Sequence, residues 1–344
     1  MRRLIPARLY PGRERVGASI TPLRFDAIGP TYDGVDWYWI PSIVGALRFL
    51  RRQRPDVVVF EWWTAAVGHS YLLLAWLARR SGASVVVEFH ETQDTGEAGL
   101  PLVARYGQFV VRRLLGLASG VVVHSEFDRR LVDEAHGLGD LPVVIAPHGP
   151  YSHERVARPA RREAPADAWN VLFFGTIRPY KGLEHLVEAY DLLPDDVAAQ
   201  CWLTVVGETW EGWTLPLELL ASSPRHERAT VVNRYVEDDE LAAWIAGADL
   251  VVLPYLRSSA SGPLHTAMNA GLPTVVTAVG GLVEAAGDYG GTSFVPPADP
   301  GAIAKAIEDL VRSGRRDERH EDPQSWDRTA ERYAELIATI DGRR

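Results

Sequence analysis

Residues 173–182 read FFGTIRPYKG, the stretch that decides the fold. It ends an apolar run, Val171–Phe174, turns at Gly175 and leads into a segment whose apolar residues repeat at helical spacing. A strand, a glycine turn and a helix in this order are typical of a Rossmann-like sheet. Ligands bind such sheets at the carboxyl ends of strands, where glycine lets them approach the backbone. Arg178 and Lys181 add two cations there, which suits a diphosphate.

The same alternation of short β-branched runs with amphipathic segments continues through the rest of the chain. It predicts parallel sheets covered by helices on both faces. The predicted strands are Val57–Phe60, Val85–Phe89, Gly120–Val123, Val143–Ala146, Val171–Phe174, Leu203–Val206, Thr230–Val232, Leu250–Leu253, Thr274–Thr277 and Ser293–Val295.

A chain of 344 residues exceeds what one core usually supports, so two domains are expected. The stretch Tyr151–Trp169 is rich in Pro, Arg, Glu and Ala and suits a linker. We predict an N-terminal domain over residues 1–152, a second domain over 168–322, and a C-terminal helix within 323–344 that packs back toward the first domain. The first 35 residues lack the apolar strand and glycine-rich turn that open a Rossmann-type domain. Either this opening strand–helix–strand unit is absent, or the reading frame extends upstream of Met1.

Charge is unevenly distributed. The net charge is −9, yet residues 1–160 carry 19 basic and 16 acidic side chains, against 17 and 29 in the remainder. Such an acidic protein is a poor candidate for nucleic-acid binding. The basic excess of the first half favours an anionic acceptor or a weak contact with a membrane surface.

The single cysteine, Cys201, predicts a buried thiol in a reducing compartment. With no secretory signal at the start, the expected location is the cytoplasm or the inner face of the membrane.

A second anion site is predicted in residues 258–271, which read SSASGPLHTAMNAG. Ser261 or Gly262 would cap a short helix, and Pro263 suits its first turn. A small-residue loop leading into a helix N-terminus binds anions through free backbone N–H groups.

Only two of the 36 basic residues are lysine. Because the chain uses arginine almost everywhere else, the lysine at position 181 indicates that a compact ammonium group is required there.

Several segments in a fixed order carry a family resemblance. The chain resembles the retaining glycosyltransferases of family four, the glycosyl transferases group 1. Their GT-B fold has two Rossmann-like domains facing across a cleft. The segments are Gly175–Gly182, Val206–Glu208, Tyr235–Leu241, Ala248–Tyr255, Ala270–Val276 and Gly280–Glu284.

The resemblance implies transfer of a sugar from a UDP- or GDP-linked donor to a sugar, lipid-linked or small-molecule acceptor, with retention of anomeric configuration. The nucleotide sugar is then a substrate, and no cofactor or metal is expected. Aspartate pairs such as Asp238-Asp239 lie at helix starts, where aspartate is common anyway. The implied roles are catalysis for His90; diphosphate binding for Gly175, Arg178, Lys181, Ser261 and Gly262; nucleobase or ribose contact for Glu208, Tyr235, Val236 and Thr266; and donor-sugar contact for Ser258 and Ser259.

Two departures from the family pattern leave alternatives open. Ser258 and Thr266 occupy the places of two glutamates that lie eight positions apart in the family. Thr176 occupies the place of a family arginine, and Arg178, two positions later, would take over the role of that arginine. One alternative is a weak or inactive homologue that binds sugar nucleotide or partners an active subunit. Another is a sugar-nucleotide 2-epimerase, which needs acid–base carboxylates; the candidates are Glu61, Glu91 and Glu208.

Overall fold

The computed structural model describes residues 7–8, 32, 35–36, 40–90, 101–147, 149 and 160–343. The chain divides into two compact units. The first consists of residues up to Ala146 together with Ala330–Arg344, and the second of Pro147–Thr329. Within the described residues, no helix has the length and apolarity needed to cross a membrane.

The first unit contains a four-stranded parallel sheet with the order β3-β4-β5-β6. It confirms the strands predicted for this half, with shifts of one or two residues at their ends. Two further strands of two residues each, β1 (Ala7–Arg8) and β2 (Val35–Asp36), pair in parallel with each other. The elements of the main sheet and its helices are α1 (Ile40–Gln53), β3 (Val57–Trp62), η2 (Ala65–Val67), α2 (Gly68–Arg80), β4 (Ser84–Phe89), α4 (Pro101–Leu115), β5 (Gly120–Val123), α5 (Glu126–His136) and β6 (Val143–Ile145).

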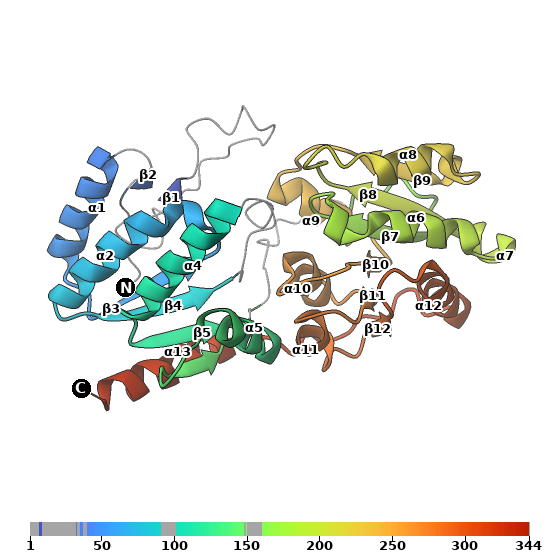
Figure 1. The fold of residues 1–344 in the computed structure, drawn as a ribbon. Helices are drawn as coiled ribbons and strands as arrows, with labels where there is room; N and C mark the ends of the chain where they lie inside the picture. Colours follow the sequence, from blue (N-terminus) through green and yellow to red (C-terminus); the bar gives the residue numbers. More distant parts are fainter. Residues whose placement is uncertain are drawn as a thin grey trace. The chain divides into compact units, whose positions relative to one another are not determined.

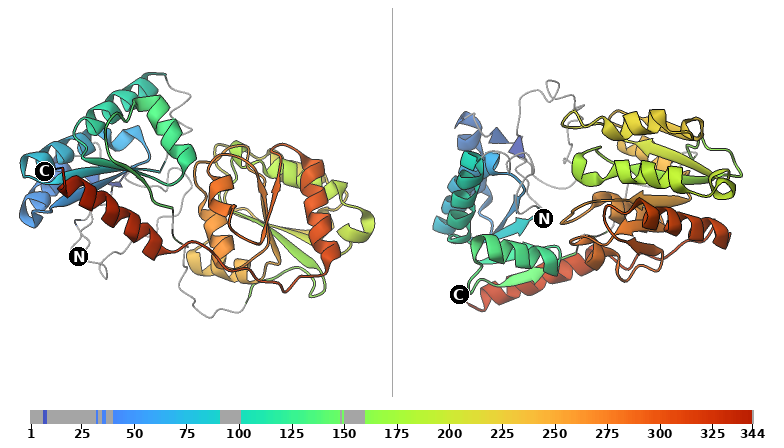
Figure 2. Two further views of the ribbon diagram at one scale, coloured as in Figure 1. Left: turned by 90° about the horizontal axis from the view of Figure 1, so that it is seen from below. Right: turned by 45° about the vertical axis from the view of Figure 1, so that its right-hand side comes forward.

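The two faces of this sheet are covered by different parts of the chain. Val85, Val87 and Val121 pack with α1, α2 and α4, whereas the intervening Val86 and Val122 pack against Leu336 and Ile340. These last two residues belong to α13 (Trp326–Asp341), the final helix of the chain. Figure 2 shows this helix, in red, running along the first unit. The end of the chain therefore completes the core of the N-terminal unit.

The second unit is a six-stranded parallel sheet with the order β12-β11-β10-β7-β8-β9 (Figure 1). The chain winds outward from β7 on one side and then returns to continue from β10 on the other. The strand order therefore reverses between β7 and β10, which is where ligands bind in sheets of this kind. The elements are β7 (Trp169–Phe174), η3 (Pro179–Lys181), α6 (Leu183–Leu192), α7 (Asp195–Ala198), β8 (Cys201–Val206), α8 (Leu215–Ser222), η4 (His226–Arg228), β9 (Ala229–Val232), α9 (Asp238–Ala246), β10 (Leu250–Leu253), α10 (Gly262–Asn269), β11 (Thr274–Thr277), α11 (Leu282–Ala286), β12 (Thr292–Val295) and α12 (Pro300–Ser313).

All six strands predicted for this half are confirmed, and one boundary is corrected. Trp169, which the composition had placed in the linker, is the first residue of β7. Its backbone N–H donates to the Gln200 carbonyl at 2.6 Å, and its side chain is buried, so the strand begins two residues before its apolar run. Cys201 is buried on β8 and not in a disulfide, as predicted. Burial raises the pKa of its thiol to about 12, so it stays protonated.

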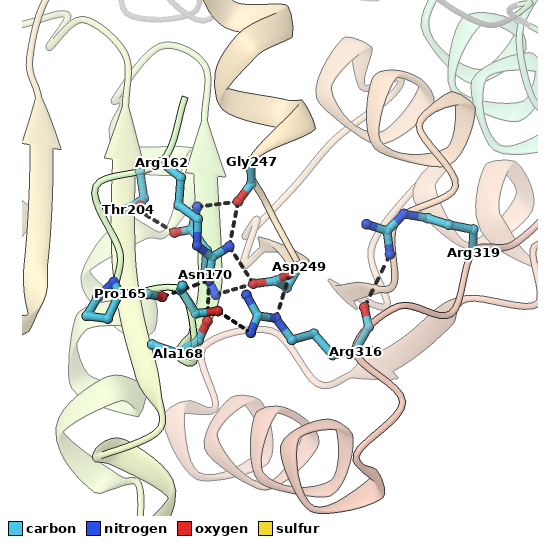
Figure 3. Close-up of polar contacts among 10 residues, drawn as sticks. Arg162, Pro165, Ala168, Asn170, Thr204, Gly247, Asp249, Arg316 and Arg319 are labelled. Atoms are coloured by element: carbon cyan, nitrogen blue, oxygen red, sulfur yellow. Dashed lines mark hydrogen bonds and ion pairs between the residues drawn. The ribbon is translucent and has the colours of Figure 1, made fainter. Parts of the chain in front are cut away.

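The amino ends of β7 and β10 are held together by a buried carboxylate (Figure 3). Asp249, 9 % exposed at its side chain, accepts hydrogen bonds from Arg162 Nη1 at 2.8 Å and from the Asn170 backbone N–H at 2.7 Å. Its other oxygen lies 2.9 Å from Arg316 Nε. Arg162 also donates to the Gly247 carbonyl at 2.8 Å. This cluster ties the segment before β7 and the segment after α12 to the same edge of the sheet.

Candidate functional site

The carboxyl ends of β7 and β10 bring two predicted segments together. Gly175 directly follows β7 with a φ of +111°, a conformation that favours glycine. A Cβ atom at Gly175 would lie 3.4 Å from Cγ of Pro263, in the first turn of α10. The glycine turn and the start of α10, which the sequence placed at one edge of the sheet, are therefore side by side.

The turn after Gly175 is fixed by the loop that follows β8. The Ile177 N–H donates to the Glu208 carbonyl at 2.8 Å, and the Trp210 N–H donates to the Ile177 carbonyl at 2.9 Å. This pairing sets the guanidinium of Arg178 over the Trp210 ring, 4.7 Å from its centroid. Glu208 accepts a hydrogen bond from Trp210 Nε1 at 3.0 Å, so its carboxylate orients this ring. Arg178 has a carboxylate nearby as well, because its Nε lies 3.4 Å from Oε1 of the exposed Glu211.

Lys181 is the buried cation of the site. Only 8 % of the residue is exposed, and its Nζ lies 3.8 Å from the centroid of the Tyr255 ring. The next residue, Gly182, has a φ of +62°, and a Cβ there would lie 2.1 Å from the Pro254 carbonyl oxygen. Only glycine allows this close approach between the end of η3 and the segment after β10. Burial raises the pKa of the Tyr255 phenol, so the ring beneath the ammonium is neutral.

A third cation, which the sequence reasoning missed, lies at the same edge. The guanidinium of the exposed Arg257 is 5.3 Å from the centroid of the Tyr180 ring, and Lys181 Nζ is 5.2 Å from the same centroid. Cation–π contacts hold a cation in place without neutralising it. The edge thus presents three positive groups on aromatic rings, an arrangement that attracts a multiply charged anion. The signal was Arg257 itself, directly before the serine-rich loop.

The start of α10 has the predicted cap. Ser261 is buried, and its Oγ accepts a hydrogen bond from the Leu264 N–H at 3.2 Å. Thr266 is also buried, and its hydroxyl donates to the Gly262 carbonyl of its own helix at 2.9 Å. The Ser258 hydroxyl donates to the Ala260 carbonyl at 2.9 Å, next to the partly buried Ser259. The hydroxyl protons of Thr266 and Ser258 are therefore donated to backbone carbonyls nearby in the chain.

The predicted nucleobase segment lies between β9 and α9. Tyr235 is 41 % exposed, and Val236 is partly buried against the core of the second unit. The neighbouring Arg234 pairs with Glu240 of α9 at 2.6 Å. An exposed aromatic ring beside a fixed backbone is suited to stacking on a planar base.

A second cluster lies in the first unit, at the carboxyl ends of β4 and β5. His90 follows β4, and its Nε2 is 3.8 Å from Oε1 of the buried Glu88. His124 follows β5, and its Nε2 is 3.6 Å from the same oxygen. Nδ1 of His124 lies 2.9 Å from the Ala146 carbonyl oxygen; because a carbonyl only accepts, Nδ1 carries the proton and Nε2 faces Glu88.

This cluster has defined electrostatics. Burial lowers the pKa of His90, while the Glu88 carboxylate acts in the opposite direction and His124 adds to the lowering. The three ligand atoms lie within 4.8 Å of one another, and two histidines with a glutamate are a donor set known from zinc sites. The sequence reasoning identified His90 but missed Glu88 and His124. Their signals were a charge inside an otherwise apolar strand and a histidine directly after one.

The fold and its two sheet edges define the class of protein, a two-domain α/β protein of the GT-B type. Comparison with known sequences then gives the family. The family model "Glycosyl transferases group 1" matches residues 168–313, and "Glycosyl transferase 4-like domain" matches residues 3–149. The D-inositol 3-phosphate glycosyltransferase of Streptomyces scabiei is 32 % identical over 325 residues, covering 85 % of this chain and 70 % of the relative. The chain belongs to the group 1 glycosyltransferases, family four.

A further sequence relative and two solved structures also resemble the chain. A protein of the same name from Streptomyces avermitilis is 29 % identical, covering 85 % of this chain and 68 % of the relative. Sucrose-phosphate synthase from Thermosynechococcus elongatus has a TM-score of 0.66 at 19 % identity, covering 94 % of this chain and 84 % of its own. HepE of Anabaena, solved in complex with UDP-glucose, has a TM-score of 0.58 at 16 % identity, covering 91 % and 85 %. These two structures share the fold.

Proposed function

We propose that this protein transfers a sugar from a UDP- or GDP-linked donor to an acceptor hydroxyl, with retention at the anomeric carbon and without a metal on the diphosphate. The observation that carries the proposal is Lys181, a buried ammonium 3.8 Å from the centroid of the Tyr255 ring, at the same carboxyl edge of the sheet as Gly175 and the start of α10. Hydrogen bonds between cationic side chains and phosphate oxygens are stronger than neutral ones, so a positive group fixed at this edge favours a donor diphosphate. The two arginines nearby, Arg178 and Arg257, add to this attraction.

The proposed chemistry is electrostatic. The bond between the anomeric carbon and the diphosphate oxygen breaks, and the acceptor oxygen bonds to that carbon on the same face of the sugar. The acceptor proton passes to the departing diphosphate, so no enzyme nucleophile is required. Negative charge grows on the diphosphate as the bond breaks, and Lys181, Arg178 and the N-terminus of α10 stabilise it where it develops.

The names of the relatives indicate which donors and acceptors to test first. HepE was solved with UDP-glucose, so UDP-linked sugars are the first donors to test. Several relatives are named for D-inositol 3-phosphate, which belongs in the acceptor panel beside free sugars and lipid-linked sugars. We place the reaction in glycan biosynthesis in the cytoplasm, with the inner face of the membrane as the site of a lipid-linked acceptor.

The direct experiment is calorimetric titration of the chain with UDP, UDP-glucose and GDP-mannose, followed by transfer assays with the acceptor panel. We expect one nucleotide series to bind, and binding to survive a chelator. NMR of the product would give the anomeric configuration. Absence of binding by every nucleotide would overturn the proposal, and an inverted product would overturn retention alone.

His90 is proposed as the residue of the first unit that acts on the donor sugar in its neutral form. Because burial lowers the pKa of His90, the neutral imidazole persists below the pH at which an ordinary histidine protonates. We expect kcat to fall as the pH falls through this lowered pKa, and the His90→Gln variant to lose that acid limb. An unchanged pH profile in the variant would remove His90 from the reaction.

The second candidate function is donor binding with little or no turnover. It is favoured by Thr266 and Ser258, which stand in place of two glutamates and whose hydroxyls bond to local backbone. The two candidates give the same titration but differ in the transfer assay. Nucleotide binding with neither transfer nor donor hydrolysis would select the second.

A further inference from the structure

The three helices α1, α2 and α4 share an unusual composition. Together they contain eight arginines and not one aspartate or glutamate. The next helix of the same unit, α5, contains four acidic residues in eleven. The arginines of the three helices are Arg48, Arg51, Arg52, Arg79, Arg80, Arg105, Arg112 and Arg113. In a chain of net charge −9, this is a local concentration of positive charge on one group of helices.

Large apolar side chains project from the same helices. Along α4, Leu102 is 80 % exposed and Phe109 is 53 % exposed, with Tyr106 between them. These residues share one helical stripe with three arginines, Arg105, Arg112 and Arg113, all of them exposed. The opposite stripe of α4, which includes Val110 and Leu114, is buried in the core. The helix is thus anchored by one apolar face and shows a mixed apolar and cationic face on its other side.

The neighbouring helices extend this pattern. α2 exposes Leu73 and Trp76, with the Arg80 guanidinium 5.0 Å from the centroid of the Trp76 ring. On α4 the Arg113 guanidinium lies 5.1 Å from the centroid of the Phe109 ring. α1 exposes Val44 with its three arginines. α2 contacts both other helices, and Figure 1 shows the three side by side. We call their exposed residues the arginine face.

We propose that the arginine face docks this protein on an anionic lipid membrane. Arginine heads attract acidic headgroups, and aromatic and leucine side chains among them enter the boundary between headgroups and acyl chains. An acidic protein surface would satisfy the cations, but it would leave Leu102, Phe109 and Trp76 without a matching environment. The inference goes beyond the proposed transfer reaction and does not depend on it, because docking is measured without nucleotide.

The test is co-sedimentation of the full chain with vesicles of phosphatidylcholine, alone or mixed with phosphatidylglycerol. The charge variant is Arg105→Ser/Arg112→Ser/Arg113→Ser, and the apolar variant is Trp76→Ser/Phe109→Ser. The matched control, Arg315→Ser/Arg328→Ser/Arg332→Ser, removes three arginines that lie elsewhere. Arg315 and Arg328 are exposed, and 43 % of the Arg332 side chain is exposed. Circular dichroism and thermal unfolding verify that each variant is folded.

We expect binding to mixed vesicles that weakens with salt, and little binding to phosphatidylcholine alone. The charge variant should bind roughly a hundredfold more weakly at low salt, about fivefold for each arginine, while the control keeps its affinity. The apolar variant should bind more weakly at every salt concentration. Equal binding by the charge variant and the control would overturn the proposal. Binding to polyglutamate without binding to mixed vesicles would also overturn it, in favour of an acidic protein partner.

Discussion

The two edges of the C-terminal sheet use the same kind of cation in opposite ways. At the amino edge, Arg162 and Arg316 surround Asp249, and the Nη1 and Nη2 atoms of Arg162 also donate to backbone carbonyls. At the carboxyl edge, Lys181 and Arg178 rest on the rings of Tyr255 and Trp210, and the one carboxylate near Arg178 that the structure describes belongs to the exposed Glu211. A carboxylate satisfies a cation, whereas an aromatic face holds it with its charge intact. The first arrangement fastens segments of the chain together, and the second places cations where we propose that the donor diphosphate binds.

The largest effect that would sharpen this comparison is expected at the amino edge. Asp249→Ala leaves Arg162 and Arg316 largely buried without their counter-ion, and should lower the free energy of unfolding by about 3–5 kcal/mol. Chemical denaturation measures this. The control is Asp309→Ala, which removes an exposed partner of Lys305 and should leave stability nearly unchanged. Nucleotide affinity of the folded Asp249→Ala protein should be unaltered; a selective loss of affinity would mean that the two edges are not separate in function.

The next largest effect is expected at Lys181. Lys181→Ala should weaken nucleotide-sugar binding by about 1.5–3 kcal/mol, because a charge-assisted contact in a buried site is lost. Calorimetric titration measures the change. The chain supplies its own control in Lys305, its other lysine, which is 63 % exposed at the side chain and pairs with Asp309 on α12. If both alanine variants bind nucleotide equally well, the buried ammonium has no part in donor binding.

A smaller effect in the opposite direction is expected at Glu211. This exposed carboxylate lies 3.4 Å from Arg178 and competes with any anion for it. Glu211→Gln should therefore tighten nucleotide binding by about two- to fivefold at low salt, the range of an exposed ion pair. The gain should shrink as salt is added. Weaker binding in this variant would show that Glu211 helps to place Arg178 on Trp210 instead of competing for it.

The sequence predicted those features of the site that depend on chain-local patterns. Gly175, the Ser261 cap and the strand ends are visible locally, because a glycine turn, a capping hydroxyl and an apolar run each depend on residues close together in sequence. The family resemblance added an order of segments and the role of His90. Contacts between residues that follow different strands could not be predicted from the sequence. Nothing near Lys181 in sequence indicates Tyr255, because the two meet only once β10 is placed beside β7.

The same limit explains why Glu88 and His124 were not predicted as site residues. They come together because β4 and β5 are neighbours in parallel register, with Glu88 opposite Val122. A sequence scan that treats each strand separately has no means of joining them. The Asp249 cluster was missed for a similar reason, since its two arginines lie more than 150 residues apart along the chain.

The packing of α13 on the N-terminal sheet has a consequence for biosynthesis. Val86 and Val122 are covered by Leu336 and Ile340, so these two sheet residues lack that cover until α13 has left the ribosome. The second unit, by contrast, is made from the uninterrupted stretch Pro147–Thr329 and can fold while synthesis continues. The first unit is thus completed after the second, and a nascent chain stalled before α13 would expose Val86 and Val122 to chaperones and proteases.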